Sequence, residues 1–323
     1  MRPPTPLPTT DAVRRDVVSD TFWERFRRAF TRLANPILVG WFVLLDVVAV
    51  VKWLQIDAFG GNVQTYHAAA QVWLAGGDPW ASPYLTSFGP QALVAPPPSL
   101  APYLLTTWLP VGAATWVWVG AGAIAAVFAV RALRLPWWWI LFPPLLFDVF
   151  WGSIDPILLL FLVSGPRWMA GALKVTFIPA MIAERAWRDL LIAGVLLVLS
   201  LAVMPWGTFL SHLRDLVGPT IVQTNGGSSA ASLPPLAVVT AGALIVLGWR
   251  RGWYLFVPAL WPLNATGYSV VSMPVLGAMP FVAAAISIPV PYLAPVVIIA
   301  TALVTLRRHD RSAASLLQIR RAR

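Results

Sequence analysis

The 323-residue chain contains no cysteine, only three histidines and few charged residues of any kind. Without cysteine, it can form neither a disulfide framework nor a thiolate metal site. His67, His212 and His309 are widely scattered and lack an HExxH spacing. The sequence therefore predicts no zinc site.

Charged residues make up 11% of the chain and hydrophobic residues 58%, with a mean hydropathy of +0.73. A soluble domain keeps about a quarter of its residues charged. This chain lacks the polar residues to cover a water-exposed surface, so we predict an integral, multi-pass membrane protein. Because a bilayer leaves unpaired backbone groups unsatisfied, the spans should be helical, and we expect an all-α fold.

The net charge of +10 is concentrated near the two ends of the chain. By the positive-inside rule both termini should be cytoplasmic, which places the protein in the cell membrane. Binding of nucleic acid is an alternative use of these arginines, but we expect anionic membrane lipids as their partners and no nucleic acid. The two clusters are Arg14, Arg15, Arg25, Arg27, Arg28 and Arg32, and Arg307, Arg308, Arg311, Arg320, Arg321 and Arg323.

The apolar blocks divide the chain into three parts. Residues 1–36 are predicted to form a cytoplasmic tail that ends in an interfacial helix, residues 37–306 a transmembrane domain, and residues 307–323 a basic cytoplasmic tail. The first span should run from Ile37 to Leu54, close to the roughly 20 residues that a bilayer requires. The 30 prolines and 22 glycines predict broken or re-entrant helices among eight to eleven spans. External loops are expected near residues 55–98 and 207–233.

An amphipathic insert, Asn62–Pro79, follows the first predicted span. Its residues separate onto two faces of a helix, and Gly76-Gly77 and Pro79 should end that helix. We predict an external surface helix, with a purely structural interfacial helix as the alternative. The apolar face holds Val63, Tyr66, Ala70, Trp73 and Leu74, and the polar face holds Gln64, His67 and Gln71.

Several ionisable residues lie within or beside the apolar blocks, where they are costly and therefore candidates for function. Asp155 precedes Pro156 at a helix break, and Lys174 has the charge to clamp an anionic phosphate. For Asp46 and Asp148, ion pairing between spans is the alternative. Asp57 lies just beyond the first span, where a carboxylate can act as a general base.

Taken in order, these segments resemble the membrane glycosyltransferases of family 87, which belong to the GT-C class. The similarity covers roughly residues 40–230, and the order and spacing of several short motifs carry it. These are Tyr66-His-Ala-Ala-Ala70 with Leu74-Ala-Gly-Gly-Asp-Pro-Trp80, Pro96-Pro97-Pro98, Trp151-Gly-Ser-Ile-Asp155 with Leu158-Leu159-Leu160, Ala170-Gly-Ala-Leu-Lys174 through Pro179, Arg185-Ala-Trp-Arg188, and Asn225 with Ser228.

The resemblance implies a GT-C fold and transfer of a sugar, mannose, from a polyprenyl-phosphate donor to a lipid-linked glycan or glycolipid at the outer face. It implies no metal and no cofactor, since the leaving group is a lipid monophosphate. The family's catalytic aspartate corresponds to Asn62 here, so Asp57 is the predicted base. The predicted substrate-binding residues are Asn62, Tyr66, His67, Gln71, Asp78, Asp155 and Lys174.

The replacement of that aspartate by Asn62 leaves two alternatives open. The chain can be an inactive relative that binds lipid-linked glycans or scaffolds other membrane enzymes. It can also be a transporter of lipids or sugars, because transporters likewise use broken helices and intramembrane charges.

Overall fold

The computed structural model describes residues 22–223, 229–262 and 266–321, which are almost entirely helical. The predicted all-α class is confirmed, and a single short β-hairpin is the only sheet within this part of the chain. The predicted tail residues 1–21 and the motif residues Asn225 and Ser228 lie outside the described residues.

The helices follow one another through short connections. The α-helices are α2 (Phe22–Gln55), α3 (Gly61–Leu74), α4 (Ala101–Leu104), α5 (Val111–Ala132), α6 (Pro143–Trp151), α7 (Asp155–Ser164), α8 (Arg167–Leu173), α9 (Ile178–Ala183), α10 (Trp187–Val203), α11 (Trp206–Gln223), α12 (Pro234–Val246), α13 (Trp249–Leu260), α14 (Met273–Leu276), α15 (Pro280–Ile286) and α16 (Leu293–Arg321). The 3₁₀ helices are η1 (Pro97–Leu100), η2 (Trp137–Leu141), η3 (Val175–Phe177) and η4 (Thr266–Ser272). Strands β1 (Tyr84–Thr86) and β2 (Gly89–Gln91) are antiparallel, with Tyr84 opposite Gln91.

Two of the described helices are long and apolar enough to cross a membrane, namely Asn35–Gln55 within α2 and the whole of α5. A third span results if α10 and the first part of α11, which are bent by 101° at Pro205, are counted together. The outward side of the α2 span is apolar, as a lipid-facing surface requires. Its exposed side chains include Val43, Leu44, Val47, Val48, Val51 and Leu54.

Full-length helices therefore do not supply the eight to eleven spans expected from the sequence. The remaining apolar blocks form shorter helices, among them α7 and α12. Proline at the first or second position begins many of these helices, including α6, α7, α9, α12 and α15. Proline is tolerated there because those amides have no partner within the helix, but it stops a preceding helix from continuing.

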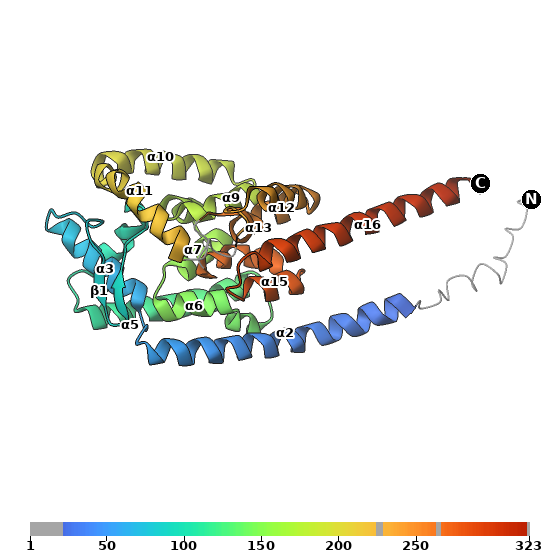
Figure 1. Ribbon diagram of the computed structural model, residues 1–323, viewed down its shortest axis with the longest axis horizontal. Helices are drawn as coiled ribbons and strands as arrows, with labels where there is room; N and C mark the ends of the chain where they lie inside the picture. The colour runs from blue at the N-terminus through green and yellow to red at the C-terminus, as the bar shows by residue number, and fades with distance from the viewer. Residues whose placement is uncertain (1–21, 224–228, 263–265, 322–323) are drawn as a thin grey trace, which may run out of the picture.

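The first helix differs from the sequence prediction in its length. The predicted interfacial helix and the predicted first span form one continuous helix, α2, with Pro36 inside it. Proline removes a single backbone hydrogen bond, and here the helix continues past it. α2 therefore reaches beyond the body of the molecule (Figure 1).

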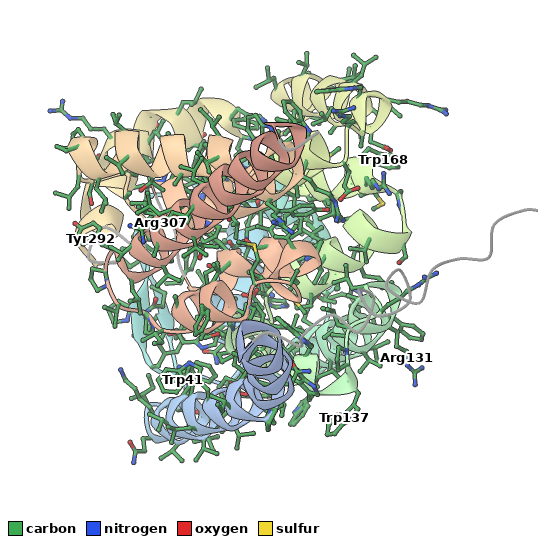
Figure 2. All side chains as sticks on the ribbon, turned by 90° about the vertical axis from the view of Figure 1, so that its right-hand side faces the viewer. Trp41, Arg131, Trp137, Trp168, Tyr292 and Arg307 are labelled. Carbon is green, nitrogen blue, oxygen red and sulfur yellow. The ribbon has the colours of Figure 1, made fainter. Side chains whose placement is uncertain are left out.

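Helix α5 packs along α7. Small residues of α5, including Ala126 and Ala129, are fully buried, which allows the two helices to approach closely. The start of α2 and the end of α16 lie at one end of the molecule, and α3 with the β-hairpin lies at the opposite end (Figure 1). Figure 2 looks onto the first of these ends, with Arg131 and Trp137 projecting at its rim.

Candidate functional site

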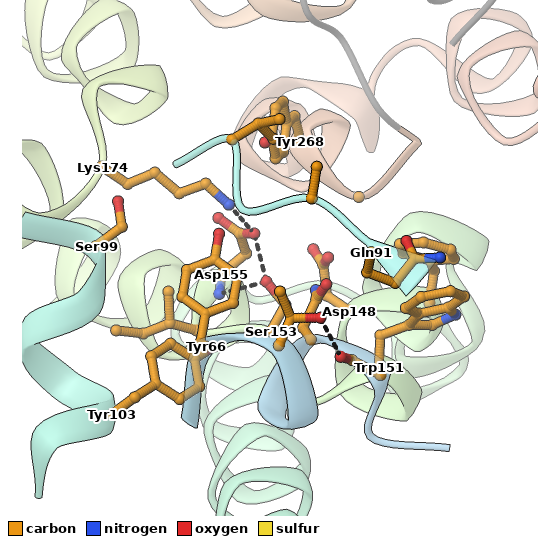
Figure 3. Close-up of a pocket in the computed structure, with 18 of the residues that line it drawn as sticks. Tyr66, Gln91, Ser99, Tyr103, Asp148, Trp151, Ser153, Asp155, Lys174 and Tyr268 are labelled. Carbon is orange, nitrogen blue, oxygen red and sulfur yellow. Dashed lines mark hydrogen bonds and ion pairs between the residues drawn. The ribbon is translucent and has the colours of Figure 1, made fainter. Parts of the chain in front are cut away.

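A cavity of about 210 Å³ opens beside the start of α3. Its wall combines the start of α3, the segment after β1, the turn between α6 and α7, the residue that follows α8, and η4 (Figure 3). These elements are far apart in the sequence and meet only in the folded chain. The lining residues are Gly61, Asn62, Thr65, Tyr66, Phe88, Gln91, Ala92, Val94, Ser99, Tyr103, Phe147, Asp148, Trp151, Ser153, Ile154, Asp155, Lys174, Gly267 and Tyr268.

Glycines allow the start of α3 to pack against the turn between α6 and α7. Gly152 has a left-handed backbone (φ +67°), and a Cβ there would lie 2.3 Å from Val63 Cγ2. A Cβ on Gly61 would lie 2.5 Å from the ring of Phe88. The amide of Gly60 donates to the carbonyl oxygen of Phe150 over 3.0 Å, which ties the two segments together. The cavity is thus bounded by close backbone contacts that a side chain would disrupt.

A buried ion pair lies on one side of the cavity. Lys174 Nζ is 2.5 Å from Asp155 Oδ2, and the hydroxyl of Ser153 donates to the same oxygen over 2.6 Å. The ammonium group also lies over the ring of Tyr268, 4.3 Å from its centroid. The side chain of Asp155 is 1% exposed and that of Lys174 is 10% exposed. Further hydrogen bonds are needed to offset the cost of burying such a pair, and in Asp155 they reach Oδ2 only.

Three buried polar atoms among the cavity residues have no hydrogen-bond partner within the described part of the chain. They are Asp155 Oδ1, Asp148 Oδ2 and Trp151 Nε1. A buried polar atom without a partner costs free energy, so a group that enters the cavity and pairs with these atoms gains that energy. Gly267 packs directly on the Asp148 carboxyl group, where a Cβ would lie 2.1 Å from Oδ1. Asp148 is held in place by backbone on one side while its other oxygen stays unpaired.

Aromatic rings form much of the remaining wall. The ring centroids of Tyr66 and Tyr103 are 4.7 Å apart, and those of Phe88 and Trp151 are 4.9 Å apart. Burial raises the pKa of the Tyr66 phenol above its ordinary value, so this residue presents a neutral hydroxyl. The Tyr103 hydroxyl donates to the carbonyl oxygen of Gly152 over 3.1 Å. The cavity therefore offers both flat apolar faces and polar groups.

Four residues predicted from the sequence come together in this cavity. Asn62 and Tyr66 reach it from the first turns of α3, Asp155 from the start of α7, and Lys174 from the residue after α8. Their roles as substrate-binding residues stay predictions.

The other four predicted residues do not line the cavity. His67 is buried, with Nε2 3.1 Å from the carbonyl oxygen of Thr106, and Gln71 donates to the carbonyl oxygen of Thr107. Asp78 contacts His212 on α11, with Nε2 and Oδ2 2.8 Å apart. Asp57, the predicted base, is exposed in the turn after α2.

Several lining residues were not predicted as site residues. Asp148 was considered because it lies within an apolar block of the sequence, with ion pairing between spans as the alternative, and Ser153 belongs to the Trp151–Asp155 motif of the resemblance. Tyr268 carries no signal in the sequence, because it reaches Lys174 only through the packing of η4. Tyr103 likewise lies in an apolar stretch that reads as ordinary core.

Among the described residues, no group of three or more histidine, cysteine, aspartate or glutamate side chains is placed to hold a metal ion. Comparison of the chain with models of protein families, with curated proteins and with solved structures finds no match in any of the three. The resemblance to family 87 therefore rests on the motifs alone.

Proposed function

We propose that the protein is a membrane glycosyltransferase of the GT-C type, and that the cavity beside α3 is its active site. The observation that carries this proposal is the set of buried, unpaired polar atoms of Asp148, Trp151 and Asp155 between aromatic walls. A sugar ring matches such a site, because its hydroxyls both donate and accept hydrogen bonds while its C–H faces pack on aromatic rings.

The size of the cavity favours one sugar unit. Pockets for drug-sized ligands measure roughly 300–1,000 Å³, and this cavity is smaller, at about 210 Å³. We infer that the transferred group is a monosaccharide, mannose according to the motif resemblance, while the lipid part of a polyprenyl-phosphate donor stays outside. The acceptor would be a lipid-linked glycan or a glycolipid.

The reaction in this proposal is a single displacement. Asp148 removes the proton from an acceptor hydroxyl as its oxygen bonds to the anomeric carbon. The bond from that carbon to the phosphate oxygen breaks, and polyprenyl phosphate leaves. Lys174 and the positive end of the α3 dipole stabilise the negative charge of the leaving group. No acidic side chain lies in the first turn of α3 to oppose this effect.

Asp148 suits the role of base better than the two other aspartates considered. The Asp155 carboxylate is engaged by Lys174 and Ser153. Asp57 is exposed and is not part of the cavity lining. Asp148 is 2% exposed and lines the cavity with one oxygen unpaired. This proposal places the base on a different residue from the one favoured by the sequence.

The proposed location is the cell membrane, with several crossings and both termini in the cytoplasm. The two or three spans and the apolar outer side of α2 support a membrane location. The start of α2 and the end of α16 lie at the end opposite α3 (Figure 1). If this end faces the cytoplasm, the cavity opens toward the outer leaflet.

The assignment of the base is tested by two matched substitutions, Asp148→Asn and Asp57→Asn, assayed with polyprenyl-phosphate mannose and extracted membrane glycolipids. We expect Asp148→Asn to lower the rate of transfer by about 10²–10⁴-fold, the usual contribution of a general base. Asp57→Asn should keep most of the parent activity.

The reverse result, with activity lost in Asp57→Asn and kept in Asp148→Asn, would overturn this assignment. If the parent chain binds the donor without any transfer, an inactive glycan-binding relative becomes the better account. The presence of Asn62 in the cavity, where the family has an acid, favours that second candidate.

A further inference from the structure

One wall of the cavity is a single extended segment, residues 91–95, which starts at the last residue of β2 and leads toward η1. Some of its side chains face the cavity and others face an apolar cluster. Gln91 lines the cavity, and from Ala92 onward the side chains alternate: Ala92 and Val94 line the cavity, whereas Leu93 and Ala95 are buried in a separate apolar cluster. Such alternation is the ordinary geometry of extended backbone, in which successive side chains point to opposite sides. The cavity and the apolar cluster therefore share this segment.

Helix α11 packs on the outer side of this wall. Phe209 of α11 belongs to the same apolar cluster as Leu93 and Ala95, and its ring centroid lies 5.4 Å from that of Trp80. The indole of Trp80 in turn donates to the carbonyl oxygen of Ala95 over 3.2 Å. Trp80 thus connects α11 to the wall, within the apolar cluster that Phe209 shares with Leu93 and Ala95.

A polar contact fixes α11 beside the loop that carries Trp80. His212 Nε2 and Asp78 Oδ2 are 2.8 Å apart, and Asp78 Oδ1 accepts a hydrogen bond from the backbone amide of Trp80 over 2.9 Å. Both side chains of the pair are about one-third exposed, at 29% and 32%. Phe209 and His212 are three residues apart on one face of the helix. Asp78 thus links α11 directly to the loop that positions the wall.

We propose that His212 and Asp78 form a clasp that holds α11 against segment 91–95, and that release of the clasp opens the cavity. The two are positioning residues that act through Trp80 and Ala95 and do not touch the cavity. α11 is well placed for such a movement, because it is the second arm of the 101° bend after α10. Entry of a lipid-linked sugar into the opened cavity rests on the proposed function. The contact between His212 and Asp78, and its effect on access to the cavity, do not depend on that function.

The absence of cysteine from the natural chain makes an accessibility test direct, since a single introduced thiol is the only one to react. Ser99→Cys places that thiol in the cavity, where Ser99 is 2% exposed. The reaction of this variant with a water-soluble maleimide should be roughly three- to ten-fold faster when His212→Ala is added, as expected for the loss of one hydrogen bond. Adding His212→Gln, which can still donate to Asp78, should give a rate near that of Ser99→Cys alone.

Leu85→Cys provides the matched control, because Leu85 lies in β1 and is 88% exposed. Its labelling rate should not change when His212→Ala is added. Equal labelling rates of Ser99→Cys with and without His212→Ala would overturn the clasp. If His212→Ala accelerated labelling of Ser99→Cys and Leu85→Cys equally, the substitution would have loosened the whole fold, and the clasp would likewise be overturned. This readout needs no turnover, so it separates failure of the clasp from failure of the proposed transferase activity. If both proposals hold, His212→Ala changes the KM for the lipid donor and His212→Gln restores it.

Discussion

Lys174 and Asp155 depend on each other within the cavity wall. Each is buried, and their contact lies beside the ring of Tyr268. Removing one member of a buried pair leaves the other as an uncompensated charge, whereas replacing both with apolar residues is often tolerated. The stability of the fold and the charge of the site can therefore be separated by substitution.

We predict that Lys174→Met lowers the free energy of unfolding by about 3–5 kcal/mol. The double variant Lys174→Met with Asp155→Leu should recover most of this loss, although neither variant should transfer sugar. Chemical unfolding in detergent provides the measurement. A double variant that is less stable than Lys174→Met would contradict the view of the pair as mutually dependent.

Gly152 and Gly76 both have left-handed backbones, but their surroundings differ. A Cβ on Gly152 would lie 2.3 Å from Val63, whereas no atom lies within 4 Å of a Cβ on Gly76. Gly76→Ala should lower stability by about 1 kcal/mol through backbone strain alone. Gly152→Ala should lower the stability clearly more than Gly76→Ala, because α3 must also shift. Gly152→Ala should also reduce ligand binding. Equal shifts of the two melting temperatures would show that the contact with Val63 is easily relieved.

Individual residues show which parts of the site could be predicted from the sequence. Asp155 and Lys174 were singled out because charge is rare within apolar blocks, and Tyr66 because it belongs to the Tyr66–Ala70 motif of the resemblance; all three line the cavity. On the polar face of α3, the side chains of His67 and Gln71 contact the carbonyl oxygens of Thr106 and Thr107 and do not line the cavity. Helical periodicity shows which residues share a face, but the neighbour of that face depends on tertiary packing.

At the scale of helices and loops, the end of α9 is joined to α13 by a polar cluster. Glu184 Oε1 accepts hydrogen bonds from Arg250 Nε and from the Tyr254 hydroxyl, each over 2.8 Å. Burial alone would raise the pKa of Glu184, but these hydrogen bonds and the charge of Arg250 outweigh it. The pKa of Glu184 consequently lies below its ordinary value of 4.5.

This lowered pKa predicts how the stability changes with pH. The stabilisation from Glu184 is fully present above about pH 4.5 and is lost as the pH falls through the lower pKa of the folded state. Thermal unfolding of the parent chain and of Glu184→Gln should therefore differ most near neutral pH and converge in acid. A difference that stays constant from pH 7 to pH 3 would show that ionisation of Glu184 does not matter to the fold.

The helix boundaries were less predictable than the helical class. Composition and apolar blocks indicate helices throughout, and prolines mark many of their first turns. Pro36 does not end α2, however, because a long helix can continue past one missing hydrogen bond. The eight to eleven spans predicted from the sequence exceed the two or three candidate spans among the described helices. An apolar stretch of sequence does not distinguish a membrane span from a short buried helix.

At the scale of the whole molecule, α3, whose start lines the cavity, lies at the end opposite the start of α2 and the end of α16 (Figure 1). α2 and α5 supply helices of sufficient length for a bilayer, and among the shorter helices α6, α8 and η4 pack against α7. In the proposed orientation, the cavity meets lipid-linked substrates at the outer leaflet and the basic ends of the chain meet anionic lipids inside.

The central claim is that the protein transfers a sugar in this cavity. The most direct test is to incubate the purified, full-length protein in detergent with polyprenyl-phosphate mannose and extracted membrane glycolipids. The products are analysed by mass spectrometry. We predict a glycolipid heavier by one hexose, formed by the parent chain and strongly reduced in Asp148→Asn. Movement of polyprenyl-phosphate mannose across the membrane of reconstituted vesicles, with no glycosylated product in detergent, would contradict the account and indicate a transporter.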